Sequence, residues 1–247
     1  METEYYAGIP VDVVTYETIL KELPEWFKSN KQKRLTSINP QIVSLAAKHP
    51  DILTYIETSD CRFPDGIGIV VLSKWLGGEI KERVTGIELM TFFLCYAAGY
   101  QKKVFLFGSQ QDIVKQAAEN IKMNFKIETC AFLDGYTKLS DEEIVQQINE
   151  SKADFLFVGL GFPLQEKWLA ANSHNIKATI ILDVGGSFDV LSGKVKRAPA
   201  FVRKYHFEWL YRSFQHPKRL IRIVQLPIFI FLVVTQKQKR LKNGEIK

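Results

Sequence analysis

The chain of 247 residues is organised around one short stretch, FPDGIG, at residues 63–68. A β-rich segment precedes this stretch and an apolar run follows it. Pro64 has a fixed φ and no backbone N–H, while Gly66 and Gly68 let a second backbone or a ligand approach closely. The stretch therefore predicts a sharp corner between a strand and a helix, with the carboxylate of Asp65 at its tip.

Two interpretations of Asp65 follow from this position. A carboxylate on a corner that flanking elements hold still can reach a ligand, and we predict that Asp65 takes a proton from a sugar hydroxyl. Alternatively, Asp65 is the N-cap of the following helix, a role that aspartate fills well. The two roles oppose each other, because a capping hydrogen bond favours the charged carboxylate and weakens it as a base.

Strand-like and helical patterns alternate on both sides of this corner. Three apolar, β-rich runs end in glycine, at Gly108, Gly159 and Gly185. This alternation predicts an α/β fold with a Rossmann-like, mostly parallel sheet and flanking helices. Ligands of such sheets bind beyond the carboxyl ends of the strands, so Asp65 and the three glycines are predicted to share that edge.

Further elements follow from local signals. The first strand is predicted at residues 9–14. Helix starts are marked by residues whose side chains accept hydrogen bonds from the first helical turn, and the candidates are Thr15, Asn39, Thr85 and Ser140.

Composition indicates a folded protein. With 46% hydrophobic and 24% charged residues, the chain can bury a sizeable core as one large domain or as a domain with an appendage. The acidic start, METE, leads directly into patterned sequence, so no secretory signal is expected. The three cysteines are too far apart for a CxxC pair and are typical of reduced thiols in the cytoplasm.

Charge divides the chain into two parts. Residues 194–247 contain 14 Lys and Arg against 2 Asp and Glu, whereas residues 1–193 contain 19 against 25. We therefore predict an α/β catalytic body over residues 1–193 and a basic, partly apolar, helical C-terminal appendage over residues 194–247. A strongly basic segment implies an anionic partner: phosphates, acidic lipid headgroups or nucleic acid.

The appendage also contains an almost wholly apolar run at residues 223–235. This run is shorter than the ~20 residues that a membrane-spanning helix needs. Apolar residues flanked by cations are typical of a helix in the membrane interface, and they favour lipid over nucleic acid. The alternative is a terminal helix that docks on the core and exposes a basic end to solvent.

No metal or cofactor site is predicted. The four histidines are scattered and no Asp-x-Asp motif is present. A bound nucleotide diphosphate would therefore be neutralised by helix N-termini and side-chain cations, with Arg83, Arg212, Arg219 and Arg222 as candidates. The spacing of the last three aligns them on one helical face, from which they could equally extend toward lipid phosphates.

Two polar residues near strand ends are further candidates. Gln165 could hold a sugar or a phosphate, or it could simply belong to the first turn of a helix. Asp189 could accept a hydrogen bond from a ribose hydroxyl, or it could cap a local turn.

Several stretches, taken together and in order, resemble the WecG/TagA/CpsF family of bacterial glycosyltransferases. The matching stretches are SIN (37–39), FPDGIGIV (63–70), ERVTG (82–86), FVGLG (157–161), QEKW (165–168), VGGSFDV (184–190), GKVKRAP (193–199) and EWLYR (208–212). One departure concerns Ser37, because the family often has Thr-Pro-Asn where this chain has Ser-Ile-Asn. Ser37 keeps the hydroxyl, but the preferred sugar is left open.

The resemblance implies an inverting, metal-independent transferase that moves a sugar from UDP to a lipid-linked acceptor at the inner face of the membrane. The best-known members transfer N-acetylmannosamine to undecaprenyl-diphosphate-linked N-acetylglucosamine, for wall teichoic acid. Alternatives are another UDP-hexose, for capsule or exopolysaccharide, and a non-catalytic nucleotide- or lipid-binding module. The resemblance implies no cofactor and no nucleic acid partner, and a homo-oligomer is left open.

The resemblance also assigns roles to residues. It implies that Asp65 is the base. The predicted substrate-binding residues comprise a sugar group, a nucleoside group and three arginines that close over the diphosphate: Asn39, Arg83 and Gln165 for the sugar; Tyr136 and Asp189 for the nucleoside; and Arg212, Arg219 and Arg222 on the appendage. Ser37, which keeps the hydroxyl of the family's threonine, is also predicted to bind substrate. Gly108 joins this set by its place at a predicted strand end.

Overall fold

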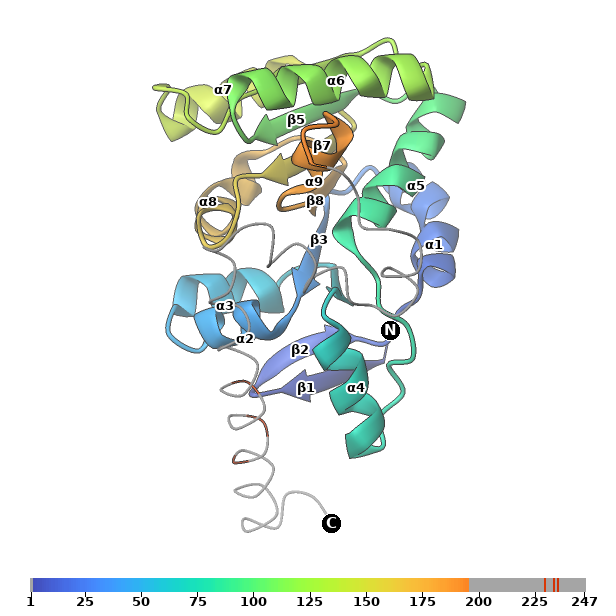
Figure 1. The fold of residues 1–247 in the computed structure, drawn as a ribbon, viewed down its shortest axis with the longest axis vertical. Coiled ribbons are helices and arrows are strands. Elements are labelled where there is room, and N and C mark those ends of the chain that lie inside the picture. Colours follow the sequence, from blue (N-terminus) through green and yellow to red (C-terminus); the bar gives the residue numbers. More distant parts are fainter. Residues whose placement is uncertain (1, 196–228, 230–232, 234, 236–247) are drawn as a thin grey trace.

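The computed structural model describes residues 2–195 together with Phe229, Val233 and Thr235. Within these residues a sheet of six strands lies at the centre (Figure 1). Its strands are β3 (Lys33–Ile38), β4 (Cys61–Pro64), β5 (Val104–Gly108), β6 (Cys130–Leu133), β7 (Phe155–Gly159) and β8 (Ile180–Asp183). The strand order is β4-β3-β8-β7-β5-β6, and every neighbouring pair is parallel, which confirms the predicted sheet.

Helices cover both faces of this sheet. They are α1 (Tyr16–Lys28), α2 (Pro40–Ala46), α3 (Pro50–Glu57), α4 (Ile67–Leu76), α5 (Gly86–Gly99), α6 (Gln111–Phe125), α7 (Asp141–Glu150), α8 (Leu164–Asn172) and α9 (Ser187–Leu191), with a 3-10 turn, η1 (Ser173–Asn175). One apolar cluster joins α1, α5, α6 and α9 to the sheet, and a second joins α2, α3, α7 and α8 to its other face. Alternate residues of β7 show the division, because Phe155 and Phe157 belong to the first cluster and Leu156 and Val158 to the second.

The predicted helix starts are confirmed. Thr15, Asn39, Thr85 and Ser140 are N-cap residues, and the side chain of each accepts a hydrogen bond from the backbone of its own helix. These bonds satisfy N–H groups that have no partner within the helix, which is why the residue type marks the boundary in the sequence.

The strand predicted at residues 9–14 is confirmed over Ile9–Asp12, although it is the second strand of the chain. The strand there, β2 (Ile9–Asp12), pairs antiparallel with an unpredicted strand, β1 (Thr3–Tyr6), in a separate two-stranded sheet. The turn between them places Ala7 and Gly8 at positive φ, 50° and 82°, as a tight hairpin requires. An ion pair between Asp12 and Arg62 of β4, with a nitrogen–oxygen distance of 2.8 Å, ties the hairpin to the edge of the main sheet.

Of the basic appendage, the structure describes Lys194, Val195 and three helical residues further along the chain. Phe229 and Val233 are buried and belong to the apolar cluster on the α2 and α3 face, and Thr235 is half-buried. Arg212, Arg219 and Arg222 lie outside the described residues, so the division at residue 193 stays a prediction. Within the described part of the chain, no helix has both the length and the apolarity needed to cross a membrane.

Candidate active site

Asp65 lies at the carboxyl edge of the sheet, directly after β4. Its backbone N–H donates to the carbonyl of Ile38 at 3.0 Å, which pins the corner to the end of β3. The N-cap residue of α4 is Gly66, so the alternative interpretation of Asp65 as that cap is wrong. The side chain of Asp65 is 27% exposed, and its carboxylate is therefore accessible to a ligand rather than sealed in the core.

Gly66 explains how two corners of the chain meet here. A Cβ atom on Gly66 would lie 2.9 Å from Cδ of Pro40 and 3.3 Å from Cβ of Asn39. Because these separations are shorter than ordinary van der Waals contacts, a side chain at this position would push the corner after β4 away from the corner after β3. The glycine therefore brings Asp65 and Asn39 to one end of the sheet.

Arg83 reaches the same corner from the loop between α4 and α5. Its Nε donates to the backbone carbonyl of Asp65 at 2.9 Å, and Nη2 lies 3.5 Å from Oδ1 of the same residue. The Arg83 side chain is 13% exposed. A guanidinium has five N–H donors, so this geometry leaves donors for a ligand oxygen beside the carboxylate.

Asn39 is fixed by the helix that it caps. Its Oδ1 accepts the backbone N–H groups of Gln41 and Ile42, at 3.0 and 3.2 Å. This uses the acceptor end of the amide and leaves its Nδ2 group as the donor end. Asn39 can therefore cap α2 and donate to a ligand at the same time.

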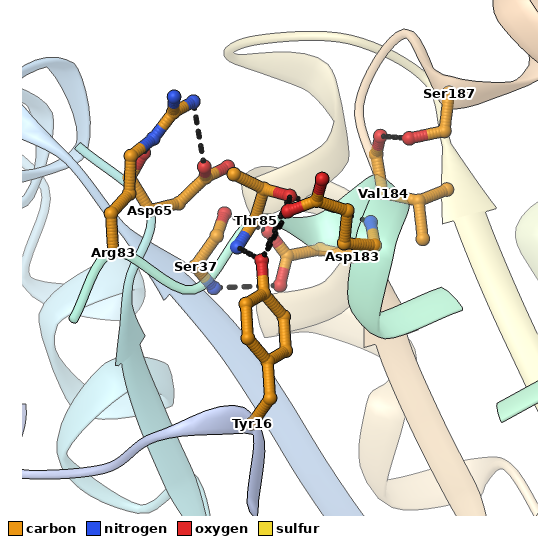
Figure 2. A network of polar contacts seen from close by, with 9 residues as sticks. Tyr16, Ser37, Asp65, Arg83, Thr85, Asp183, Val184 and Ser187 are labelled. Carbon is orange, nitrogen blue, oxygen red and sulfur yellow. Dashed lines mark hydrogen bonds and ion pairs between the residues drawn. The ribbon is translucent and has the colours of Figure 1, made fainter. Parts of the chain in front are cut away.

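A buried carboxylate, Asp183, connects three segments at this edge, and Figure 2 shows it beside Ser37. It is the last residue of β8 and is 3% exposed. Oδ1 accepts the backbone N–H of Ser37 at 2.8 Å, and Oδ2 accepts the Ser37 hydroxyl. Oδ2 also accepts Nε2 of Gln165 at 3.3 Å. Asp183 thus holds two predicted substrate-binding residues in place.

Burial in the sheet raises the pKa of Asp183 to about 6. The hydrogen bonds from the Ser37 hydroxyl and N–H favour the charged form and lower this pKa, whereas the nearby charge of Asp65 raises it. Desolvation outweighs the hydrogen bonds because the carboxylate has lost almost all contact with water. Asp183 is therefore ionised at neutral pH and becomes protonated in mildly acidic solution.

Gln165 lies in the first turn of α8, which agrees with the second of its two interpretations from the sequence. Its side chain is buried, its Nε2 donates to Asp183 and to Glu166, and its Oε1 accepts the backbone N–H of Gly185 at 2.9 Å. Glu166 is also buried, at 4% exposure. In this structure Gln165 links neighbouring elements of the protein, and its contact with a sugar or phosphate stays a prediction.

The loop that carries Arg83 is anchored by Tyr16, the first residue of α1. The Tyr16 hydroxyl accepts the backbone N–H of Thr85 at 2.7 Å and donates to Glu88 Oε2 at 2.7 Å. The backbone N–H of Tyr16 donates to Glu82 Oε2 at 3.1 Å. Figure 2 shows this tyrosine below the Asp65 and Asp183 carboxylates. Tyr16 therefore fixes the loop on both sides of Arg83.

The other predicted residues lie further along the edge. Gly108 ends β5 at a φ of 131°, and a Cβ there would lie 2.4 Å from the carbonyl of Gly159, so only glycine fits. Tyr136 follows β6 and is 76% exposed. Asp189 lies half-buried in α9, after β8. These residues share the carboxyl edge, but no hydrogen bond among the described residues joins Tyr136 or Gly108 to the Asp65 corner.

Asp183 and Tyr16 are the positions that the sequence analysis missed. Asp183 had a signal, because it is a lone carboxylate within the otherwise uncharged run 179–184, and Val184 separates it from two glycines. Burying a charge in a strand costs free energy unless the charge is hydrogen-bonded, so a carboxylate there indicates nearby hydrogen-bond donors. Tyr16 had no such signal, because its partners lie about 70 positions away in the chain.

The described residues contain no group of three or more His, Cys, Asp or Glu side chains that could hold a metal ion. The reaction's independence of metal remains a prediction.

A parallel α/β sheet whose carboxyl edge presents an accessible carboxylate beside a guanidinium has the organisation of a ligand-binding α/β enzyme. The chain belongs to the WecG/TagA/CpsF family of glycosyl transferases, whose model matches residues 5–243, and this confirms the family expected from the sequence. It is therefore a glycosyltransferase.

Curated relatives match along nearly the whole chain. A protein of Staphylococcus aureus named N-acetylglucosaminyldiphosphoundecaprenol N-acetyl-beta-D-mannosaminyltransferase is 33% identical over 234 residues, which cover 94% of this chain and 92% of that protein. A protein of the same name from Bacillus spizizenii is 33% identical over 226 residues, covering 90% of this chain and 88% of the relative.

Proposed function

We propose that this enzyme transfers N-acetylmannosamine from UDP-N-acetylmannosamine to undecaprenyl-diphosphate-linked N-acetylglucosamine, with inversion and without a metal ion. The names of the relatives, which match more than nine-tenths of the chain in the first case, support the donor sugar and the acceptor. The observation that carries the chemistry is the partly exposed carboxylate of Asp65 beside Arg83 at the carboxyl edge of the sheet.

In the proposed reaction Asp65 is the general base. It takes the proton of the acceptor hydroxyl while that oxygen attacks the anomeric carbon from the side opposite UDP. The bond from this carbon to the diphosphate oxygen breaks, and its electron pair leaves with UDP, so the configuration inverts. A positioned base contributes ~10²–10⁴-fold to such a step.

Charge at the site supports a role for the basic appendage. The carboxylates of Asp65, Asp183 and Glu166 lie at or behind this corner, and the guanidinium of Arg83 contacts it. A diphosphate brings further negative charge, which must be neutralised as the bond to UDP breaks. We propose that Arg212, Arg219 and Arg222, which lie outside the described residues, supply this charge in place of a metal ion.

We further propose that residues 194–247 form the appendage that completes the site and contacts the inner face of the cell membrane, where the enzyme is peripherally associated. The lipid-linked acceptor requires access to a membrane surface, and net positive charge in this segment favours anionic lipid. An active site completed there would limit hydrolysis of the donor away from its acceptor.

The test is transfer itself. Purified full-length protein, treated with EDTA, is incubated with UDP-N-acetylmannosamine and a short-chain lipid-diphosphate-N-acetylglucosamine, and the disaccharide lipid is measured by mass spectrometry. We expect product with the β configuration at the new bond. Tight UDP binding without transfer to a lipid acceptor would contradict the proposal and would favour a non-catalytic module.

The identity of the donor sugar needs its own comparison. Ser37-Ile38-Asn39 replaces the family's frequent Thr-Pro-Asn at the predicted sugar pocket, which favours testing a second candidate function, transfer of another UDP-hexose for capsule or exopolysaccharide. A panel of UDP-sugars offered with the same acceptor separates the two. N-acetylmannosamine should give the highest kcat/KM, and a higher value for another hexose would replace it.

A further inference from the structure

Asp183 lies where two neighbouring strands stop pairing. The last paired residues of β3 and β8 are Leu35 and Leu182, although β3 continues beside β4 as far as Ile38. Beyond that point the Asp183 carboxylate takes the place of a strand, because its Oδ1 accepts the backbone N–H of Ser37 at 2.8 Å. The carboxyl edge of the sheet is therefore held together here by a side chain.

The second oxygen of Asp183 determines the polarity of the Ser37 hydroxyl. An ionised carboxylate accepts hydrogen bonds and cannot donate, so the contact between Oδ2 and Ser37 Oγ uses the single hydroxyl hydrogen of the serine. The hydroxyl oxygen then has only its lone pairs left and can act only as an acceptor. Ser37 is buried, at 7% exposure, at the carboxyl end of β3, so a contact between its hydroxyl oxygen and a ligand is part of the proposal below.

Gln165 is a second side chain that donates to Asp183. Its Nε2 donates to Asp183 Oδ2 at 3.3 Å, while its Oε1 accepts the N–H of Gly185 at 2.9 Å. Gln165 and Ser37 therefore approach the same carboxylate oxygen from different elements, α8 and β3. Loss of the carboxylate would leave the N–H and the hydroxyl of Ser37 without their acceptor and Gln165 Nε2 with Glu166 alone, and buried unpaired donors are destabilising.

We propose that Asp183 is a positioning residue for the sugar end of the site. It takes the hydroxyl hydrogen of Ser37, so that Ser37 presents only oxygen lone pairs and selects a sugar that offers an O–H or N–H group at that point. This inference rests on the proposed function and deepens it, because it specifies one hydrogen-bond polarity of the donor site.

The test is a double-mutant cycle in the full-length enzyme, with KM for the UDP-sugar and kcat measured separately. Asp183→Asn places an N–H donor beside the serine, so the hydroxyl must turn its hydrogen toward the ligand. We expect this variant to raise KM roughly 10- to 100-fold and Ser37→Ala to raise it about tenfold, with smaller changes in kcat. In the Asp183→Asn background, Ser37→Ala should then raise KM by less than twofold.

A merely structural role would not produce this coupling. The matched control is Thr36→Val, which removes a buried hydroxyl from the same strand whose partner is Ser59 rather than Asp183. We expect it to lower the melting temperature and to leave KM unchanged. Independent, multiplicative effects of Asp183→Asn and Ser37→Ala on KM would overturn the proposal, as would an unchanged KM in Ser37→Ala.

A second measurement covers the case in which Asp183→Asn does not fold. In the wild type, KM should rise as the pH falls below about 6, because protonated Asp183 no longer fixes the hydroxyl as an acceptor. The titratable groups that face Asp183 are Asp65 from the corner after β4, Glu166 from α8 and Tyr55 from α3, and Ser37→Ala retains all three. The acid rise in KM should disappear in Ser37→Ala, and its persistence would overturn the inference.

The outcomes separate this inference from the proposed function. A wild type that transfers no UDP-sugar overturns the proposed function and the inference with it. If the wild type transfers its sugar and Ser37→Ala has the same KM, the inference alone is overturned.

Discussion

The carboxyl edge of the sheet has two regions that are built differently. The polar half, at the ends of β4, β3 and β8, consists of the hydrogen-bonded side chains of Ser37, Asp65, Arg83, Gln165 and Asp183. The glycine half, at the ends of β7, β5 and β6, consists of the closely packed backbones of Gly108, Gly135 and Gly159 with the exposed ring of Tyr136 beside them.

The two halves suit different parts of a transfer reaction. Groups that must act on reacting atoms are held by bonds before the substrate arrives, because reorganisation during the reaction would weaken them. A nucleoside needs only a flat surface and close backbone approach, which small residues and an aromatic ring provide. We therefore propose that the sugar binds at the polar half and the nucleoside at the glycine half.

The largest expected change in stability comes from the glycine half. Gly108→Ala should lower the free energy of unfolding by about 3 kcal/mol or more, because the new Cβ would meet the carbonyl of Gly159 at 2.4 Å and the φ of 131° is strained for alanine. Chemical denaturation measures this. The control is Gly99→Ala, whose Cβ would meet nothing within 4 Å. Equal stabilities of the two variants would refute the close packing.

In the polar half, stability should depend on the titration of Asp183. Its folded pKa of about 6 lies above the ordinary value of 3.8, so folding favours the protonated form. The stability that this group contributes is fully present below pH 3.8 and is lost as the pH rises through 6, by about 3 kcal/mol in all.

The measurement is denaturant unfolding of wild type and Asp183→Asn from pH 4 to 7.5. The stability of the wild type relative to the variant should decline across this range, because asparagine does not titrate. A constant difference would mean that Asp183 has an ordinary pKa.

Tyr136 tests the role of the glycine half in binding. Because its side chain is 76% exposed, Tyr136→Ala should leave the melting temperature unchanged. Loss of stacking on the uracil base should raise the Kd for UDP roughly tenfold, since base–aromatic stacking contributes ~1–3 kcal/mol. Titration calorimetry with UDP checks this, with Tyr136→Phe as the matched variant that keeps the ring. Equal Kd values for all three proteins would remove Tyr136 from the nucleoside site.

The smallest expected effect separates two functions of Asn39. Asn39→Ala should lower stability by about 1 kcal/mol through loss of the cap of α2, whereas Asn39→Asp should keep the cap and the stability. Both variants lack the amide N–H donors, so both should raise KM for the UDP-sugar. If Asn39→Asp has the wild-type KM, the Asn39 amide does not contact the sugar.

Much of the polar half could be predicted from the sequence because its signals are local. Asn39 before a proline and Thr85 three residues before Glu88 mark helix starts wherever they occur, and Asp65 is conspicuous between proline and glycine. The identity of the cap of α4 was wrong by one residue, since either Asp65 or Gly66 could end the corner and only the backbone geometry decides.

The remainder depended on contacts between distant segments. The strand order, which places β8 between β3 and β7, brings Asp183 next to Ser37 across 146 positions of the chain, and no local pattern encodes that pairing. The β1–β2 hairpin was missed because its turn is short and carries an alanine at positive φ, where Asn or Asp would have been the usual signal.

The proposed mechanism depends on Asp65 as the general base, and kcat of Asp65→Asn measures that role. The variant keeps the size of the side chain and removes its basicity, while Asp51→Asn, in the first turn of α3, serves as the matched loss of an exposed carboxylate. With melting temperature and UDP affinity unchanged, we predict that kcat falls ~10²–10⁴-fold in Asp65→Asn and stays at the wild-type value in Asp51→Asn. Turnover by Asp65→Asn at the wild-type rate would show that Asp65 is not the base.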